Sequence, residues 1–256
     1  MDEAMVEKIV TAVVKAIQGG DFDSGGKNAA PTDTSATPAR IAIGHAGPRL
    51  KTQTYLKFRA DHAIARDAVL QDVPQEVLNK LQLPAFKTKC KDKNEFLTQP
   101  DLGRQLDDDT LRAMKQRNPS PCDALIYAAD GLSSRAVAAN LEDILPILSD
   151  GLRQQGVSSG KPFFLQYGRV GSMDSIGPAL QAKVVCVLLG ERPGLGSAES
   201  MSAYVAYQPT AGMPEARRTV ISNIYAGGLN AVEAGAYLAE LIGKIFREKK
   251  SGVELS

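Results

Sequence analysis

One stretch of the sequence, residues 184–190 (VVCVLLG), constrains the fold more than any other. Its seven residues are apolar or glycine, none carries a charge, and β-branched side chains are frequent. A run this short and this continuous predicts a strand buried on both faces, as in the interior of a parallel sheet. Glu191, Arg192 and the pair Pro193-Gly194 come next, so we expect the strand to end at Gly190.

The turn after this strand is the first candidate for a functional site. In open α/β sheets, ligands bind in the crevice beyond the carboxyl ends of the strands. Glu191 and Arg192 stand at that end of the most buried strand. The same two residues also fit a solvated turn pair, and the local pattern alone does not decide between the two interpretations.

Composition and charge exclude several classes of protein. The formal net charge is +1, so the chain lacks the basic excess with which nucleic-acid-binding proteins displace counterions. No apolar run approaches the ~20 residues that span a bilayer, and the N-terminus lacks the basic-then-apolar order of a secretory signal. Three cysteines without metal-ligand spacing indicate reduced thiols, and two histidines are too few for a multi-histidine site. We therefore expect a cytosolic chain with no nucleic-acid or membrane partner and no metal ligands.

The N-terminus predicts a detached unit. Apolar residues recur at helical spacing over residues 1–18, with charged and polar residues between them, and Gly19-Gly20 ends the pattern. Residues 19–38 (GGDFDSGGKNAAPTDTSATP) have one aromatic residue and almost nothing to bury, as is typical of a flexible linker. An amphipathic helix on a tether needs a partner for its apolar stripe. The alternative is a helix that folds back on the body of the protein.

Residues 39–120 predict a helical region. We expect a short extended segment over residues 40–49, a long helix over 53–71, further helices over 73–83 and 106–116, and mostly surface loop over 87–101. The long helix is rich in charged residues. They form either a solvated face or a face presented to another chain or to an anionic ligand.

An α/β pattern begins at Ala124. Strand-like segments at residues 124–130, 162–170, 183–190, 203–209 and 219–224 alternate with helical segments, the last of which runs from 229 to about 249. Pro146 is expected to kink or break the helix that follows the first strand. The fold class is therefore α/β, a mostly parallel Rossmann-like sheet flanked by helices, preceded by a helical N-terminal region and a tethered amphipathic helix. The corresponding domains are residues 1–38, 39–120 and 121–256.

The chain carries no motif of a complete enzyme. It has no P-loop and no G-x-G-x-x-G fingerprint, no nucleophile elbow, and no D-x-H-x-x-G stretch of the kind that replaces the lower base of cobalamin. We assign no catalytic residue. What remains are four turns at the ends of predicted strands, at residues 130–133, 167–170, 190–195 and 222–224. In a parallel sheet they lie at one edge and line one crevice.

These segments, in this order, resemble the small subunit of ethanolamine ammonia-lyase over residues 40–256. The matching pieces are GHAGPRLKTQ, FRADHAIARDAVL, DKNEFLTQPDLGRQL, DGLSS, PFFLQYGRV, AKVVCVLLGERPGLGSAES and TVISNI. The resemblance implies a heteromeric, adenosylcobalamin-dependent lyase that converts ethanolamine to acetaldehyde and ammonia by a radical mechanism. A large (β/α)8-barrel subunit holds the substrate, and base-on cobalamin lies between the subunits. The small subunit contributes to the wall around the cofactor and is not expected to be active alone.

The family's cofactor contacts carry over to three residues of this chain. They are Val170 in YGRV, Glu191 in GERPG, and Val220, which precedes Ile221-Ser222-Asn223. The resemblance implies that Glu191 accepts a hydrogen bond from a corrin amide and that the two valines offer apolar wall or backbone groups. The family has Cys at the Val220 position, so this contact is expected through main chain or shape rather than sulfur chemistry. Asp130 and Ser133 are either neighbours of the site or helix-capping residues.

The resemblance also implies partners and a location. The expected assembly is a dodecamer of six large and six small subunits in the bacterial cytoplasm, inside a microcompartment. Residues 1–18 resemble an encapsulation peptide that binds the shell. Two other classes remain as alternatives: a structural adaptor without essential cofactor contacts, and a self-sufficient oxidoreductase or transferase with a nucleotide cofactor. The missing glycine fingerprint counts against the latter.

Overall fold

The computed structural model describes residue 41, residues 43–118 and residues 121–255. The predicted amphipathic helix and linker, residues 1–38, lie outside the described residues. The chain divides between Arg59 and Ala60 into two units. In the described part of the first unit, β1 (His45–Ala46) and β2 (Arg49–Leu50) form a short antiparallel hairpin, and α2 (Thr52–Leu70) begins directly after it. The helix predicted over residues 53–71 is thereby confirmed.

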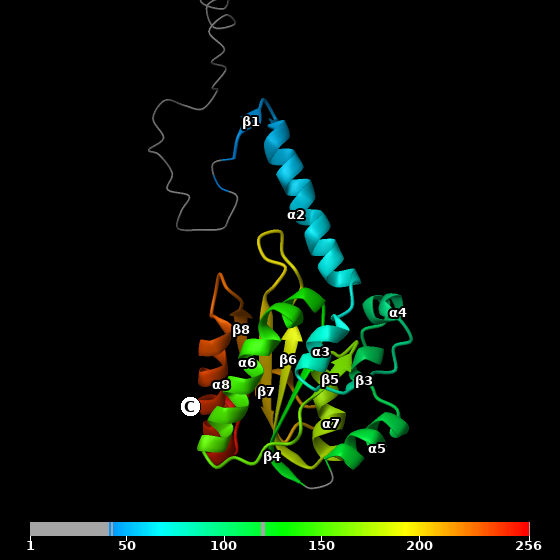
Figure 1. The fold of residues 1–256 in the computed structure, drawn as a ribbon, viewed down its shortest axis with the longest axis vertical. Helices are drawn as coiled ribbons and strands as arrows, with labels where there is room; N and C mark the ends of the chain where they lie inside the picture. Colours follow the sequence, from blue (N-terminus) through cyan, green and yellow to red (C-terminus); the bar gives the residue numbers. More distant parts are fainter. Residues whose placement is uncertain (1–40, 42, 119–120, 256) are drawn as a thin grey trace, which may run out of the picture. The chain divides into compact units, whose positions relative to one another are not determined.

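The second unit is built on a six-stranded sheet in the order β3-β5-β4-β6-β7-β8 (Figure 1). The first four strands in that order are parallel, β7 is antiparallel to β6, and β8 is antiparallel to β7. The mostly parallel sheet predicted from the sequence is confirmed. The strands are β3 (Ala85–Lys87), β4 (Cys122–Ala129), β5 (Phe163–Gln166), β6 (Ala182–Gly190), β7 (Met201–Tyr207) and β8 (Thr219–Ile224).

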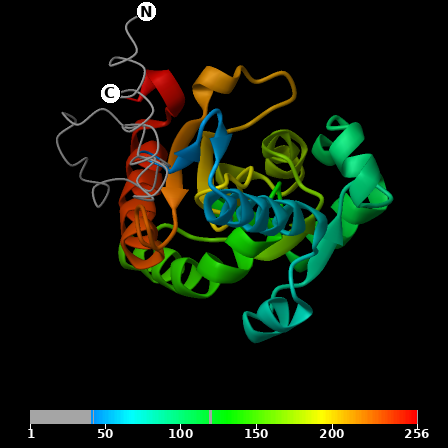
Figure 2. The ribbon, with the colours of Figure 1, turned by 90° about the horizontal axis from the view of Figure 1, so that it is seen from above.

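Helices cover both faces of this sheet, α6 (Ser134–Gln154) and α8 (Ala231–Glu248) on one and α7 (Met173–Ala179) on the other (Figure 2). β6 shows why residues 184–190 are uniformly apolar. Val184, Cys186 and Leu188 pack toward α6 and α8, whereas the alternate residues pack into the core on the other face with α5 (Asp108–Arg117) and α7. All of these β6 side chains are at most 7% exposed. A strand covered on both sides has no position for a polar residue.

Helix ends follow local signals in the sequence. Ser133 accepts a hydrogen bond from the Ala136 amide at the start of α6, and Asn230 accepts one from the Glu233 amide at the start of α8. α6 continues through Pro146, so the break that the sequence allowed does not occur. Of the predicted helices, residues 73–83 contain α3 (Gln75–Lys80), and 106–116 correspond to α5.

The prediction for residues 87–101 is wrong. This segment was expected to be mostly surface loop, but it contains the end of β3 and the helix α4 (Lys93–Thr98), and the turn η1 (Leu102–Arg104) follows it directly. Most of its residues are charged or polar, but Cys90 and Phe96 are buried in the core, at 1% and 0% exposed. With Thr88, which is 4% exposed, three of the fifteen residues are buried. Three positions at this spacing do not produce a helical or strand period, so only the tertiary contacts reveal the packing.

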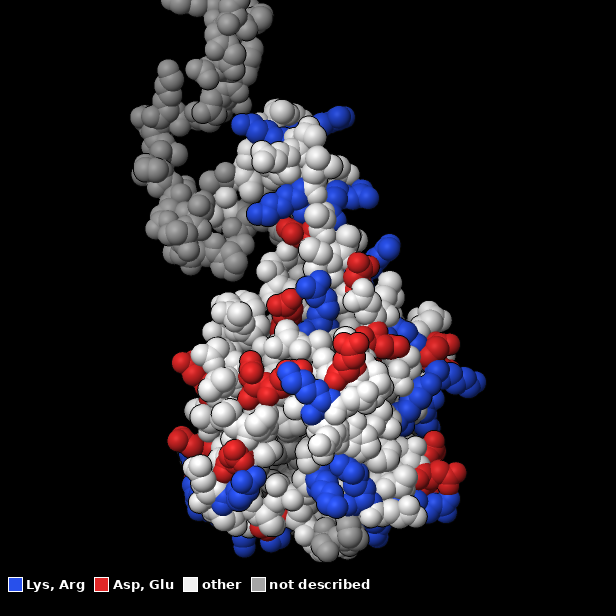
Figure 3. Space-filling view, in the orientation of Figure 1, with Lys and Arg blue, Asp and Glu red and all other residues white. Residues whose placement is uncertain are grey.

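Charges of both signs are interspersed over the face formed by α6 and α8 (Figure 3). This face has no continuous basic field of the kind that nucleic-acid binding requires. Within the part of the chain that the structure describes, none of the helices combines the length and apolar character needed to cross a bilayer.

Candidate functional site

The four strand-end turns lie at one edge of the sheet, as the sequence predicted. β4, β5 and β6 are parallel, so their carboxyl ends coincide. β8 reaches the same edge for a different reason: the chain reverses twice, and Gly190, Met201 and Ile224 pair in register across β6, β7 and β8. The result is the strand-edge crevice in which α/β proteins bind ligands.

Two hollows open along this edge. The first, here called the Val170 pocket, has a volume of about 430 Å³ and is lined by both Val170 and Glu191. The second, the Ser222 pocket, has a volume of about 410 Å³ and is lined by hydroxyl and amide side chains together with Glu191. Those side chains belong to Ser197, Ser200, Ser222 and Asn223. Glu191 therefore stands where the two pockets meet.

Glycine is required where the turns after β4 and β6 touch. A Cβ atom on Gly190 would lie 2.1 Å from the Ser133 carbonyl oxygen, and one on Gly131 would lie 2.3 Å from the Gly190 carbonyl oxygen. The Leu132 amide donates to the Gly190 carbonyl at 2.9 Å. Because the two turns meet backbone to backbone, neither position has room for a side chain, and both glycines lie in the lining of the Val170 pocket.

Glu191 is held by a residue that sequence reasoning missed. The Tyr204 hydroxyl, on β7, donates a hydrogen bond to Oε1 of Glu191 at 2.9 Å. Burial, and then the adjacent Glu191 carboxylate, raise the pKa of Tyr204, so the phenol stays protonated and remains a donor. Glu191 makes no ion pair with any described residue, which leaves its second oxygen available to a ligand. Tyr204 has no motif of its own, since only the pairing of β6 with β7 brings it to Glu191.

Val220 lies next to Tyr204 in the sheet but does not line a pocket with Glu191. It pairs with Tyr204 between β7 and β8, and directly opposed residues share a face of the sheet. Its side chain is 43% exposed and lines neither of the two pockets. Val170 and Glu191 thus share one hollow, while Val220 lies beside it across Tyr204.

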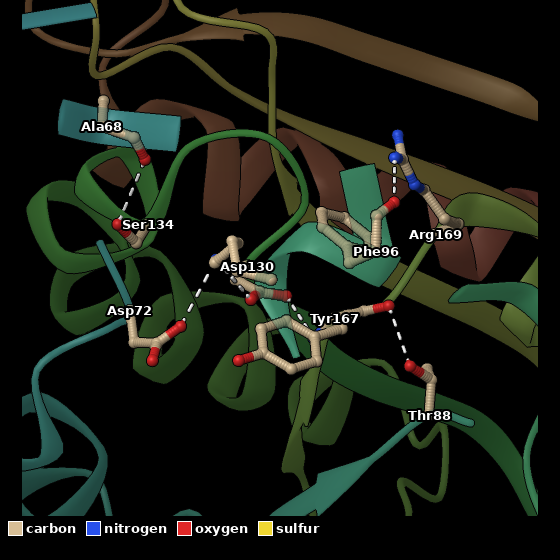
Figure 4. Close-up of polar contacts among 9 residues, drawn as sticks. Ala68, Asp72, Thr88, Phe96, Asp130, Ser134, Tyr167 and Arg169 are labelled. Atoms are coloured by element: carbon tan, nitrogen blue, oxygen red, sulfur yellow. Dashed lines mark hydrogen bonds and ion pairs between the residues drawn. The ribbon is translucent and has the colours of Figure 1, made fainter. Parts of the chain in front are cut away.

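Asp130 and Ser133 support the turns and line neither pocket. Ser133 caps α6 and donates to the Ala198 carbonyl at 2.6 Å. Asp130, which is 1% exposed, accepts a hydrogen bond from the Tyr167 amide at 2.6 Å and lies 3.3 Å from the ammonium of Lys93 (Figure 4). Burial raises the pKa of Asp130 to about 6, although Lys93 and the Tyr167 amide oppose that rise.

The turn that carries Val170 is anchored by the mispredicted segment. Tyr167 has a left-handed backbone with φ of 60°, a strained conformation for a bulky residue. Its carbonyl accepts a hydrogen bond from Thr88 at 3.1 Å, and its ring stacks on Phe96 with 5.8 Å between centroids (Figure 4). Contacts from α4 and from the segment before it therefore hold the strand-end turn in place.

The residues at this edge are suited to binding rather than to bond making. The part of the chain that the structure describes holds no cluster of three or more His, Cys, Asp or Glu side chains able to bind a metal ion. Cys186 is enclosed in β6, where burial raises the pKa of its thiol to about 12. Glu191 is half-buried, and Arg192 is exposed without a partner among the described residues. The fold is that of an α/β protein with two pockets at the carboxyl edge of its sheet.

Comparison with known proteins identifies the family. The family model described as ethanolamine ammonia-lyase light chain matches residues 29–256. Relatives named ethanolamine ammonia-lyase small subunit are 53% identical over 219 residues in Clostridium tetani, and 51% identical in Listeria monocytogenes and in Clostridioides difficile. Each alignment covers 86% of this chain and 74–75% of the relative. The chain belongs to the ethanolamine ammonia-lyase light chain family and is a subunit of a carbon–nitrogen lyase. The resemblance deduced from the sequence is confirmed.

Proposed function

We propose that this chain forms part of the wall around adenosylcobalamin in ethanolamine ammonia-lyase, where it meets the large barrel subunit. The observation that carries the proposal is the position of Glu191: it stands between two pockets at the strand edge, with one carboxylate oxygen fixed by Tyr204 and the other unpartnered. In this proposal the chain binds and orients the cofactor, and the large subunit holds ethanolamine.

The residues at the edge fit the chemistry of a corrin periphery. A corrin carries primary amides around an apolar ring, so it presents N–H donors, carbonyl acceptors and a flat apolar face. The unpartnered oxygen of Glu191 is an acceptor for an amide N–H, and the serines and Asn223 of the Ser222 pocket supply donors and acceptors. Val170 and the half-exposed Val220 supply apolar contacts. Gly131 and Gly190, which have no side chains, allow close approach.

The reaction assigns this chain a positioning task. When bound, adenosylcobalamin supplies the adenosyl radical with which the conversion of ethanolamine to acetaldehyde and ammonia begins. Glu191 and the two valines hold the periphery of the cofactor, and Tyr204 keeps Glu191 in one rotamer. In this proposal the groups that act on substrate belong to the large subunit.

The test is the affinity of adenosylcobalamin for the assembled complex of large and small subunits, measured by equilibrium dialysis. Glu191→Ala is expected to weaken binding about tenfold, as loss of a hydrogen bond to a charged group does. Glu76→Ala removes an exposed carboxylate on α3 and serves as the matched control. Unchanged affinity in Glu191→Ala would refute the cofactor contact and favour the structural adaptor.

We also propose the assembly that the family resemblance implies. The large and small subunits form a six-plus-six dodecamer, and residues 1–18 bind the shell of a microcompartment. The apolar stripe of the sequence over residues 1–18 supports the second part. Analytical ultracentrifugation of the co-expressed subunits tests the stoichiometry. Deletion of residues 1–18 is expected to leave activity intact and release the enzyme from purified shells, and retention of the deleted form would contradict the proposal.

A further inference from the structure

Two arginines that line the Val170 pocket, Arg104 and Arg169, are placed side by side by the fold. Arg104 ends η1, and Arg169 precedes the turn η2 (Val170–Ser172). The Arg169 amide donates to the Gly103 carbonyl at 2.9 Å. A Cβ atom on Gly103 would lie 2.7 Å from Cγ of Arg169, and one on Gly171 would lie 3.2 Å from Cδ of Arg104. The Arg169 stem therefore lies over Gly103, which precedes Arg104, and the Arg104 stem lies over Gly171, two residues after Arg169.

Arg169 is rigidly positioned. Its guanidinium lies 4.1 Å above the ring of Phe96 and donates to the Phe96 carbonyl at 2.9 Å. Phe96 is fully buried, so the platform beneath the guanidinium does not move freely. Nε of Arg169 is buried without a hydrogen-bond partner among the described residues. A planar cation held in this way matches the preorganised fork with which arginine binds phosphate and carboxylate groups.

The charge of the arginine pair is not matched by acidic residues. No described carboxylate lies within salt-bridge distance of Arg169, and Arg104 has only an exposed contact of 4.0 Å with Asp101. Burial lowers the pKa of Arg169. Cys90 and Asp130 oppose this shift, and the like charges of Arg104 and Arg192 add to it.

The neighbouring Arg218 shows the usual arrangement. It is buried and pairs with Asp174 at 2.7 Å and with Glu215. Of the two carboxylates that line the Val170 pocket, Glu215 pairs with Arg218. Glu191 keeps its charge, accepts a hydrogen bond from Tyr204 and makes no ion pair with either arginine among the described residues. The pocket thus has a cationic side whose counter-ion is not supplied by the described residues.

We propose that Arg104 and Arg169 form a phosphate-binding site, and that its occupant is the phosphodiester of the cofactor's nucleotide tail. This inference rests on the proposed function, since the ligand of the Val170 pocket is the same cofactor. Cobalamin carries one phosphodiester, which is an anion with two unesterified oxygens. Two guanidinium groups in the pocket lining bind such a group by charge-assisted hydrogen bonds. Glu191 then contacts the corrin, and the arginine pair contacts the tail.

The experiment compares three corrinoids on the assembled complex of large and small subunits. Cobalamin and cobinamide phosphate carry the phosphate, whereas cobinamide lacks the phosphate and the nucleotide. Arg104→Gln is expected to weaken binding of the two phosphate-bearing ligands about tenfold, the effect of losing one charge-assisted hydrogen bond, and to change cobinamide affinity less than about twofold. Arg153→Gln, which removes an exposed arginine paired with Asp150 on α6, is the matched control.

Arg169→Lys provides a second variant that keeps the charge but removes the planar fork. It is expected to weaken the phosphate-bearing ligands selectively, with the melting temperature recorded to confirm folding. Equal losses for all three ligands, or no loss, would overturn the proposal. If the variants instead weaken subunit association, measured by size exclusion, the arginine pair belongs to an acidic group of the large subunit and the proposal also fails.

The result that would contradict the proposed corrin contact differs from the result that would contradict the phosphate site. Glu191→Ala tests the corrin contact and is expected to weaken all three ligands, cobinamide included. If Glu191→Ala has no effect while Arg104→Gln remains selective for phosphate, the corrin contact is wrong and the phosphate site stands. If inorganic phosphate at constant ionic strength competes with cobinamide as well as with cobalamin, phosphate binds where the corrin binds rather than where the nucleotide tail binds, and the assignment of the occupant is overturned.

Discussion

Asp130 offers a prediction whose sign and size follow from its surroundings. Burial raises its pKa from 3.8 to about 6 in the folded protein. A rise of about two pKa units corresponds to about 3 kcal/mol of folding free energy. Between these two pKa values the folded state binds more protons than the unfolded state. The contribution of Asp130 to stability is therefore fully present below about pH 4 and is lost as the pH rises to about 6.

Asp130→Asn removes this titration and keeps an acceptor for the Tyr167 amide. We expect the difference in unfolding free energy between pH 4 and pH 7 to shift by about 3 kcal/mol relative to the wild type, measured by urea denaturation at each pH. Comparison at each pH cancels the titration of all other groups, which both proteins share.

Asp123 provides a control of opposite sign. Burial raises its pKa, but hydrogen bonds from Ser158 and Lys183 outweigh burial and leave the pKa lowered. Its contribution is present at neutral pH and is lost in acid, so Asp123→Asn should change the pH profile in the opposite direction. Parallel profiles of the wild type and Asp130→Asn would refute the reasoning, because they would mean that Asp130 titrates alike in the folded and unfolded chains.

Three further predictions concern the architecture of the site. Gly190→Ala places a methyl group 2.1 Å from the Ser133 carbonyl oxygen and should destabilise the protein by about 3 kcal/mol or prevent its folding. A thermal midpoint equal to that of the wild type would show that the two turns can separate. Phe96→Ala removes a fully buried ring beneath Tyr167 and Arg169, and should cost about 3–5 kcal/mol in urea denaturation; a loss below about 1 kcal/mol would contradict its anchoring role. Tyr204→Phe should leave the melting temperature unchanged and weaken adenosylcobalamin binding to the complex about fivefold. In a chain that already carries Glu191→Ala, Tyr204→Phe should not weaken binding further; additive losses would mean that Tyr204 does not act through Glu191.

Residue patterns along the chain predicted the helices and strands whose buried residues recur at a regular spacing. Residues 184–190 of β6 are covered on both faces, so all of them are apolar or glycine and the strand can be detected in a short window. α6 and α8 each bury one apolar stripe, which predicted both helices, and the serine cap predicted the start of α6. The segment at residues 87–101 failed because its contribution to the core is concentrated in Cys90 and Phe96, which leaves no period to detect.

The sequence by itself determined the α/β class, the position of the buried strand, the common edge of the turns after the three parallel strands β4, β5 and β6, and the family. These depend on local periodicity, on turn residues and on the order of segments, all of which are properties of the linear chain. Tertiary structure alone decided that Tyr204 holds Glu191, that Val220 lies across Tyr204 from the Val170 pocket, and that Arg104 and Arg169 form a pair. Each of these contacts joins residues that different strands or turns bring together, and neither propensity nor spacing encodes which distant side chain completes a hydrogen bond.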